Sequence, residues 1–320
     1  MTILMSSADP RELAEAALQK ASVPEGRAVR CSPAVPGVAS PSYHGVESST
    51  YAVALDDRAP EFFLKVTTSE IRWLIDQPAA FDAAAKIAAM GLGPQPLALI
   101  EAEGATLFRH LGAGWRVARL DDLRQPDRMA DVIAAHRRIA DGPSFARTWN
   151  VFDVIAELWA HIGATDAVLP PDAWYLKDHI DFARDAIMAA GFDSRPAQAD
   201  PHASNILFGP DGGVRLVDFD MAANVDPYYQ LGALLNEACP FDSEMKPAIE
   251  MFEGQCRDAT LHRCLAYAAA DDFYWALRSL LLDRVAPRRS LEFRKYAGWR
   301  FLRCRMRVNR PGFEEMLRSL

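Results

Sequence analysis

The sequence predicts an α+β protein of two lobes, a small β-rich N-terminal lobe and a large, mostly helical C-terminal lobe. Three observations support this. Short runs of β-forming residues separated by turn residues fill most of the first 110 residues. After Gly112 the hydrophobic residues recur with helical periodicity. One short hairpin interrupts those helices. We expect a helical segment over residues 1–26, an N-lobe over 27–111 and a C-lobe over 112–320.

Local signals place the elements of the N-lobe and of the segment before it. Asp9 and Pro10 predict a helix start, with Asp9 as the N-cap and Pro10 in the first helical position. Residues 50–57 and 61–66 alternate in hydrophobicity, and the turn residues between them predict a hairpin. A helix is expected over 79–90, because glycines and a proline follow it. Further strands are expected at 96–100 and 105–111.

The C-lobe is expected to be helical on both sides of a single hairpin. Helical periodicity covers 129–140, 151–162 and 174–190, and it resumes from about Gln230 to the end of the chain. Between these helices, two short runs of β-forming residues flank the turn GPDGG. These runs are residues 205–208 and 214–219.

Composition excludes several classes of protein. Half of the 320 residues are hydrophobic and 24% are charged, which is typical of a globular protein rather than a disordered chain or a coiled coil. The net charge of −8 does not favour a generic nucleic-acid binder. No run of about 20 apolar residues predicts a membrane span. The five scattered cysteines do not form a disulfide framework, so we expect a cytoplasmic protein. The oligomeric state is left open.

One stretch, residues 198–220, concentrates polar residues that suit phosphoryl transfer. Asp200 lies in a loop, Asn205 follows five residues later, and Asp218 ends the second strand of the predicted hairpin. The hairpin would bring these three side chains to one end. A carboxylate can act as the base for a hydroxyl group, and carboxylate and amide oxygens are ligands for Mg²⁺ bound to phosphates.

The same stretch resembles a known family. The spacing D-x4-N, followed by a strand that ends in D-F, is that of the protein-kinase catalytic loop and metal-binding aspartate. The surroundings are similar to the choline/ethanolamine kinase and aminoglycoside phosphotransferase families, whose pattern I-D-[FW]-E-x-A-x-x-x-D-P-x-Y-D-L-A is matched by VDFDMAANVDPYYQLGALLNE. The resemblance covers roughly residues 40–315. It implies a protein-kinase-like fold and an ATP- and Mg²⁺-dependent phosphotransferase acting on a hydroxyl of a small molecule.

The resemblance also implies roles for individual residues. Asp200 matches the catalytic base, and Asn205 and Asp218 match the Mg²⁺ ligands. Lys65 matches the lysine that contacts the nucleotide phosphates.

Two further segments correspond to parts of the nucleotide site. The loop Gly45–Tyr51 matches the loop over the phosphates, with Ser48 and Ser49 as the implied contacts. Residues 107–111 match the connector beside which the adenine would bind.

Four positions depart from the family pattern. Gln198 stands where the family usually has a histidine, Gln230 stands where it has an aspartate, and Ser48 stands near its phosphate-loop asparagine. The family also places a glutamate near Ala80 to pair with the lysine, and the nearest acid here is Asp82. These departures keep open a pseudokinase that binds nucleotide or a partner without turnover.

Four residues are candidates for binding the acceptor, and two classes of acceptor fit the resemblance. His202, Asp220, Trp275 and Arg278 are the candidate substrate residues, and a choline- or ethanolamine-type amino alcohol is the first expectation, with an aminoglycoside or sugar as the alternative. Choline kinases that resemble this chain carry W-x-x-W, whose aromatic faces hold a quaternary ammonium. Here Arg278 takes the second position. If it faces the cleft, an anionic or polyhydroxyl acceptor is favoured. The alternative is that it pairs with an acid such as Asp271, Asp272 or Glu237.

One region is strongly basic. From Arg284 to Arg310 there are ten Lys or Arg residues and a single acid. We expect a solvated basic helix face, with a docking surface for an anionic partner as the alternative.

Overall fold

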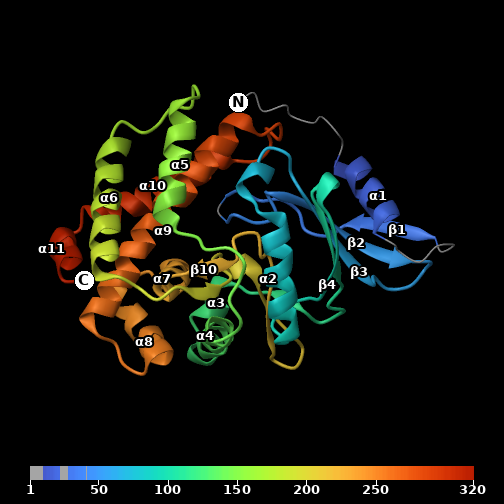
Figure 1. The fold of residues 1–320 in the computed structure, drawn as a ribbon, viewed down its shortest axis with the longest axis horizontal. Helices are drawn as coiled ribbons and strands as arrows, with labels where there is room; N and C mark the ends of the chain where they lie inside the picture. Colours follow the sequence, from blue (N-terminus) through green and yellow to red (C-terminus); the bar gives the residue numbers. More distant parts are fainter. Residues whose placement is uncertain (1–9, 22–27, 41) are drawn as a thin grey trace.

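The computed structural model describes residues 10–21, 28–40 and 42–320, which form two lobes side by side. Figure 1 shows the sheet and α1 in one lobe and most of the helices in the other. The bilobal α+β prediction is confirmed. The predicted N-cap Asp9 lies outside the described residues, but the helix does begin at Pro10.

The N-lobe is built on one five-stranded antiparallel sheet in the order β1-β2-β3-β5-β4. Its two helices are α1 (Pro10–Lys20) and α2 (Gln77–Ala89). The strands are β1 (Val29–Pro33), β2 (Ser48–Leu55), β3 (Phe62–Thr67), β4 (Pro96–Ile100) and β5 (Ala105–Arg109). Short 3₁₀ turns cover Arg72–Leu74 (η1) and Glu101–Glu103 (η2).

Helix α1 belongs to the N-lobe in space. Its buried face, made by Ala14, Ala17 and Leu18, packs in one apolar cluster with β2, β3 and β5. The strands alternate, so that every second side chain of β3 enters this cluster. The opposite face of the sheet looks toward the C-lobe, and Lys65 lies on that face.

The C-lobe is mostly helical, and α9 forms its centre. The helices are α3 (Leu120–Leu123), α4 (Pro126–Ala140), α5 (Val151–Gly163), α6 (Ala173–Ala190), α7 (Pro227–Ala238), α8 (Asp242–Glu253), α9 (Asp258–Val285), α10 (Phe293–Val308) and α11 (Phe313–Arg318). Helix α9 is buried on nearly all sides, and its buried charged residues, which include Asp272 and Arg278, are paired within the protein. In the described part of the chain, no helix is both long and apolar enough to cross a membrane.

Small strands in the C-lobe hold the polar stretch identified from the sequence. The predicted hairpin forms as β8 (Ile206–Phe208) and β9 (Val214–Leu216), joined at its edge by β6 (Arg116–Val117). A second pair consists of β7 (Arg195–Ala197) and β10 (Ala223–Val225). The residues 203–205 form a 3₁₀ turn, η3, directly before β8. Asn205 therefore precedes one strand and Asp218 follows the other.

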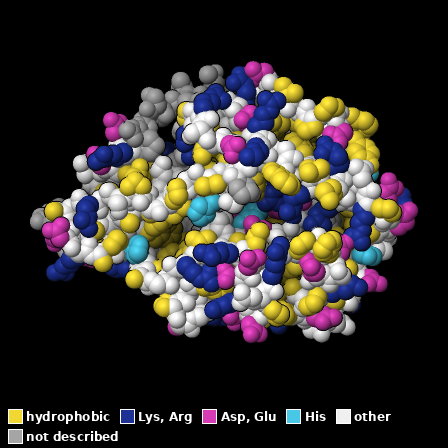
Figure 2. All heavy atoms as spheres, turned by 180° about the vertical axis from the view of Figure 1, so that it is seen from behind, with side chains coloured by type: hydrophobic (Ala, Val, Ile, Leu, Met, Phe, Trp, Pro, Cys, Tyr) yellow, Lys and Arg dark blue, Asp and Glu magenta, His cyan; other side chains and the backbone are white. Residues whose placement is uncertain are grey.

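The basic stretch of residues 284–310 is largely neutralised within the protein. Arg300, Arg303 and Arg307 all contact Asp272 of α9, at 2.8, 3.1 and 3.5 Å. Arg305 binds Asp172 in front of α6 at 2.5 Å. On the face drawn in Figure 2, Lys and Arg side chains are mixed with Asp and Glu rather than gathered in one patch. These arginines attach the closing helices to the lobe.

Candidate active site

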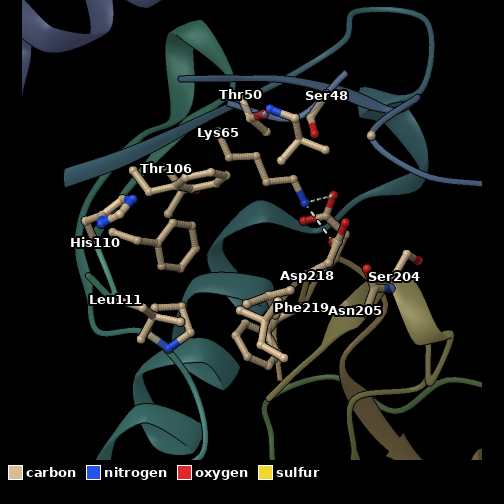
Figure 3. Close-up of a pocket in the computed structure, with 18 of the residues that line it drawn as sticks. Ser48, Thr50, Lys65, Thr106, His110, Leu111, Ser204, Asn205, Asp218 and Phe219 are labelled. Atoms are coloured by element: carbon tan, nitrogen blue, oxygen red, sulfur yellow. Dashed lines mark hydrogen bonds and ion pairs between the residues drawn. The ribbon is translucent and has the colours of Figure 1, made fainter. Parts of the chain in front are cut away.

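A cavity of about 300 Å³ lies between the lobes. Strands β2, β3 and β5 line one side of it, and the turn η3 with the segment 217–220 lines the other. Residues 108–112 also border it, so most of the predicted connector 107–111 does lie at this cavity, although Leu107 points into the sheet core. The predicted nucleotide lysine and both predicted metal ligands share this one space (Figure 3).

Lys65 extends from β3 toward two carboxylates. Its Nζ lies 2.7 Å from Asp218 Oδ1 and 2.8 Å from Asp220 Oδ2. Figure 3 shows the lysine crossing the cavity toward Asp218. Burial by itself would lower the pKa of Lys65, but the charges of Asp218 and Asp220 outweigh burial and raise it, so the ammonium remains charged.

These contacts show that Asp82, the acid nearest to the family's helix glutamate, is not the partner of Lys65. Asp82 instead binds Lys86 one helical turn away, at 2.7 Å. Ala80 and Phe81 are the α2 residues at the cavity, together with the nearly buried Gln77. The second carboxylate that binds Lys65 is Asp220. Asp220 is one of the candidate substrate residues predicted from the sequence. Burial raises the pKa of Asp220 to about 6, against the opposing effect of Lys65.

The two serines of the predicted phosphate loop face opposite ways. Ser48 and Thr50 line the cavity, whereas Ser49 does not. All three belong to β2, in which successive side chains point to opposite faces of the sheet. The structure therefore places Ser48 and Thr50, rather than Ser49, at the cavity, and the nucleotide contact of Ser49 stays a prediction. His44 and Gly45 complete this wall.

The loop that carries Asp200 is held in an unusual backbone conformation. Ala199 has a φ of +61°, a region that costs a non-glycine residue roughly 1–2 kcal/mol. Its N–H donates to Gln230 Oε1 at 2.6 Å, and Gln230 Nε2 lies 3.2 Å from His136 Nε2. Gln198, which is fully buried, donates to the Val217 carbonyl at 2.5 Å. The two glutamines that depart from the family pattern thus tie the Asp200 loop to α7 and to the segment before Asp218.

Asp200 is oriented by two side chains. His202 Nδ1 lies 2.6 Å from Asp200 Oδ1, and Asn205 Nδ2 donates to Oδ2 at 2.7 Å. Arg300 approaches His202 Nε2 at 2.8 Å. A guanidinium can only donate, so Nε2 accepts and Nδ1 carries the proton that is shared with Asp200. Burial would raise the pKa of Asp200, but His202, Arg278 and Asn205 together lower it, so the carboxylate is ionised at neutral pH.

The residues fit a divalent cation held with nucleotide phosphates. Asn205 uses its amide nitrogen on Asp200, which leaves its oxygen available at the cavity. Asp218, with a φ of +61°, presents its carboxylate to the same space. Within the described residues, no three His, Cys, Asp or Glu side chains cluster closely enough to hold a metal alone. Two hard oxygen ligands with phosphates and water are the typical arrangement for Mg²⁺.

A second cavity, of about 250 Å³, begins where the first one ends. Both cavities are bordered by Asp220. The second is walled by aromatic and charged side chains from η1, the start of α2, the loop before α5, α5 itself and α9. They include Trp73, Asp76, Arg147, Trp149, Glu157, Tyr274 and Arg278. Sequence reasoning missed Arg147 and Trp149, because they lie in a loop without periodicity or motif.

Arg278 does border the second cavity, but its charge is used within the protein. Its guanidinium binds Glu47 through two contacts of 2.5 Å, and it lies 5.4 Å from the Trp275 ring. Arg278 therefore pairs with an acid, as the alternative predicted, but the acid is Glu47. Asp271 and Asp272 bind Arg300 instead. Glu47 is on the N-lobe, 231 residues away along the chain.

The aromatic face of Trp275 is also occupied. Tyr43 of the N-lobe packs on it with ring centroids 4.9 Å apart, and His202 lies 5.2 Å from it. Tyr43 also contacts Tyr296 at 5.1 Å and donates its hydroxyl to Glu47 at 2.6 Å. Trp275 is therefore buried, and it does not line the second cavity.

Comparisons with known proteins agree with this architecture. The family model described as "Phosphotransferase enzyme family" matches residues 39–267. A choline/ethanolamine kinase family protein from Mesorhizobium loti is similar in structure, with a TM-score of 0.76 and 21% identity, covering 96% of this chain and 100% of that one. Choline kinase LicA from Streptococcus pneumoniae gives a TM-score of 0.75 at 12% identity, with 93% and 99% coverage.

A more distant structure extends the likeness to antibiotic kinases. The spectinomycin phosphotransferase in complex with ADP and spectinomycin gives a TM-score of 0.55 at 12% identity, covering 90% of this chain and 92% of that one. No curated protein sequence matches the chain. At these identities the solved structures establish the protein-kinase-like fold, while the family model spans more than two thirds of the sequence. The chain belongs to the phosphotransferase enzyme family.

Proposed function

We propose that the protein transfers the γ-phosphoryl group of ATP to a hydroxyl group of a small molecule. The observation that carries the proposal is the shared cavity in which Lys65, Asp218 and Asn205 meet, with Asn205 bonded directly to Asp200. One cation and two oxygen ligands face the space for phosphates, and one ionised carboxylate adjoins it. Positioning and charge stabilisation of this kind account for most of the rate in phosphoryl transfer.

Each of these groups has a defined task in the reaction. Lys65 binds phosphate oxygens, while Asp218 and the oxygen of Asn205 would hold Mg²⁺. When bound, Mg²⁺ neutralises the charge of the phosphates. Asp200 accepts the proton of the acceptor hydroxyl as that oxygen bonds to the γ-phosphorus. The bond between the γ-phosphorus and the bridging oxygen breaks, and ADP leaves with that oxygen. His202 and Asn205 keep Asp200 in place.

The acceptor site does not favour a trimethylammonium group at Trp275. That indole already has two close neighbours, Tyr43 at 4.9 Å and the Arg278 guanidinium at 5.4 Å. A cation–π contact needs an aromatic face that is free for the ligand. Choline is therefore a less favoured acceptor, and the proposed activity is the phosphorylation of another hydroxyl compound.

A second candidate is a nucleotide-binding protein without turnover. It is favoured by one observation, the direct contact of Lys65 with both Asp218 and Asp220 in place of a partner on α2. In this candidate the lysine and the metal-binding carboxylate neutralise one another and need not separate.

Two measurements separate the candidates. The melting temperature is measured with and without ATP and Mg²⁺, and ATP consumption is then followed over a panel of neutral, cationic and anionic hydroxyl compounds. Nucleotide stabilisation together with acceptor-dependent ATP consumption supports the kinase. Stabilisation without consumption for any compound supports the second candidate, and no stabilisation at all contradicts both.

A further inference from the structure

The second cavity contains a cation that the fold holds in place without a direct hydrogen-bond or ion-pair partner for its side chain. This cation is the guanidinium of Arg147, which lies in the loop between α4 and α5. Among residues 10–21, 28–40 and 42–320, no side chain or carbonyl group lies within hydrogen-bonding or ion-pair distance of this guanidinium. Arg147 is only partly exposed. An arginine is always charged, so burial without a partner is unfavourable unless a ligand supplies one.

The loop that carries Arg147 is fixed by Asn224 of β10. The Asn224 side chain donates to the carbonyls of Phe145 and Arg147, at 2.8 and 3.0 Å, and accepts from the Phe145 N–H at 2.9 Å. The Asn224 backbone adds a bond to the Arg147 carbonyl and one from the Trp149 N–H. Five hydrogen bonds thus hold the backbone on both sides of Arg147, while its side chain has none. Such a backbone places a binding group with little loss of freedom on ligand binding.

The other charged side chains of the cavity are either paired with an opposite charge or exposed to solvent. Arg278 is balanced by Glu47, and Asp220 is balanced by Lys65. Asp76 and Glu157 are exposed, so water and salt screen their charges, and Asp76 already accepts from the Ala79 N–H as the N-cap of α2. Burial lowers the pKa of Arg147, which reflects the incomplete solvation of its charge. The charges of Asp76 and Glu157 oppose this effect, but neither carboxylate lies within ion-pair distance of Arg147, so its guanidinium has room for a direct anionic partner.

The remaining walls suit a small organic molecule. Trp149 and Tyr274 are buried with ring centroids 5.9 Å apart, and Trp73 adds a third aromatic side chain. Tyr274 is next to Trp275, which contacts His202, the partner of Asp200. Asp220, at the other end, belongs to the same segment as Asp218. The cavity therefore borders the segment that carries Asp218, and its wall residue Tyr274 is linked to Asp200 through Trp275 and His202.

We infer that the acceptor carries an anionic group, a carboxylate or a phosphate, which binds Arg147 in the cavity formed with Trp149 and Tyr274. This inference rests on the proposed function, and it adds the class of acceptor. A guanidinium matches the geometry of both anions through paired N–H donors. The aromatic walls exclude water around the pair. Arg147 replaces Arg278 as the cation that selects the acceptor.

The test uses four probes of similar size in the presence of Mg-ADP. Glycerate and glycerol 3-phosphate carry the two anions, glycerol is the neutral reference with the same skeleton, and choline is the cation. Binding is measured by calorimetry to the wild type, to Arg147→Gln and to the matched control Arg58→Gln, which alters an exposed arginine in the turn between β2 and β3. Because the Arg147 side chain has no direct partner in the described structure, its replacement does not lower the melting temperature.

The expected result is a preference for at least one anion over glycerol of about tenfold or more. A hydrogen-bonded contact to a charged group contributes about 1.5–3 kcal/mol, so Arg147→Gln weakens binding of that anion by about 10- to 150-fold. Glycerol and Mg-ADP bind equally well to all three proteins, and Arg58→Gln behaves as the wild type. Comparison of glycerate with glycerol 3-phosphate identifies the anion.

Three outcomes overturn the inference. Choline or glycerol binds as well as both anions, or the anion preference survives Arg147→Gln, or no probe binds while Mg-ADP does. In each of these cases a kinase with another acceptor still stands. Failure of Mg-ADP to bind contradicts the proposed function instead. If an anion then still binds in a way that depends on Arg147, the anion site is supported although the protein is not a kinase.

Discussion

The two cavities that meet at Asp220 differ in how their charges are arranged. In the first, Lys65 is held between Asp218 and Asp220, so the protein supplies both the cation and its counter-charges. In the second, the charges of Asp76 and Glu157 act on Arg147, but among the described residues no carboxylate lies within ion-pair distance of its guanidinium. The first arrangement suits a ligand that brings both charged phosphates and a metal. The second suits a ligand that brings a negative charge alone.

The difference also separates residues that match a family pattern from residues that match none. Lys65, Asn205 and Asp218 match the pattern, and the fold brings them to one space. Arg147 and Trp149 match no pattern. Variants of each cavity should therefore affect different steps, and the following predictions run from the largest expected effect to the smallest.

Removal of Asp218 should affect the first cavity alone and abolish function. Asp218→Ala deletes a proposed Mg²⁺ ligand, and it leaves Lys65 with Asp220 as its only carboxylate. We expect Mg²⁺-dependent nucleotide binding to be lost in calorimetry, with Asn205→Ala weakening it less. Binding of the anionic probe in the absence of nucleotide should persist. Unchanged Mg-ATP affinity in Asp218→Ala would show that the first cavity is not the nucleotide site.

Replacement of Asp200 should separate chemistry from binding in both cavities. Asp200→Asn keeps the shape and removes the proton acceptor, so turnover should fall by about 10²- to 10⁴-fold, which is the usual contribution of a general base. Nucleotide and acceptor affinities should change little. The matched control is Asp193→Asn, at an exposed loop position. Near-wild-type turnover in Asp200→Asn would exclude Asp200 as the base.

Disruption of the Glu47–Arg278 pair should destabilise the contact between the lobes beside the second cavity. The Arg278 side chain is 3% exposed, and removal of one partner from a buried ion pair typically costs about 3–5 kcal/mol. Glu47→Gln and Arg278→Trp should each lower the free energy of unfolding by roughly this amount. The double variant Glu47→Gln/Arg278→Met should lose less free energy of unfolding than the sum of the losses in Glu47→Gln and Arg278→Met alone.

This result also bears on the W-x-x-W comparison. Restoring the second tryptophan by Arg278→Trp should not create efficient choline phosphorylation, because Tyr43 still covers Trp275. Choline turnover in that variant, with unchanged stability, would mean that the cation at position 278 and not Arg147 sets the acceptor class.

The smallest effect should appear as a pH dependence of stability beneath the Asp200 loop. Burial lowers the pKa of His136 to about 4, below its ordinary value near 6.5. The unfolded chain therefore takes up the proton first, and stability falls as the pH drops from about 6.5 to 4. The expected contribution between pH 7 and 4.5 is roughly 2–3 kcal/mol.

The check for His136 is a comparison of variants in urea unfolding. His136→Gln should lose less stability than the wild type over this pH range, and His262→Gln, at a less buried histidine beside Ser319, should follow the wild type. Parallel curves for wild type and His136→Gln would contradict the assignment. Because His136 supports Gln230, which binds the Ala199 N–H, His136→Gln should also reduce turnover more than nucleotide affinity.

The sequence by itself determined the two lobes, the hairpin and the candidate nucleotide residues. The reason is physical: hydrophobic periodicity and turn residues act over a few positions, and the hairpin β8–β9 needs only its own turn to bring Asn205 and Asp218 near each other. The position of Ser49 away from the cavity also follows from the alternation of side chains along β2. The match to a loop pattern did not take this alternation into account.

Only the tertiary structure decided which distant charges meet. Arg278 binds Glu47 and Lys65 binds Asp220, and these partners are joined by the packing of one lobe on the other rather than by local spacing. The same holds for Arg147, whose loop is positioned by Asn224 from a strand 77 residues later. Through-space contacts of this kind carry no periodic signal, so the acceptor side of the molecule could be seen only in the folded protein.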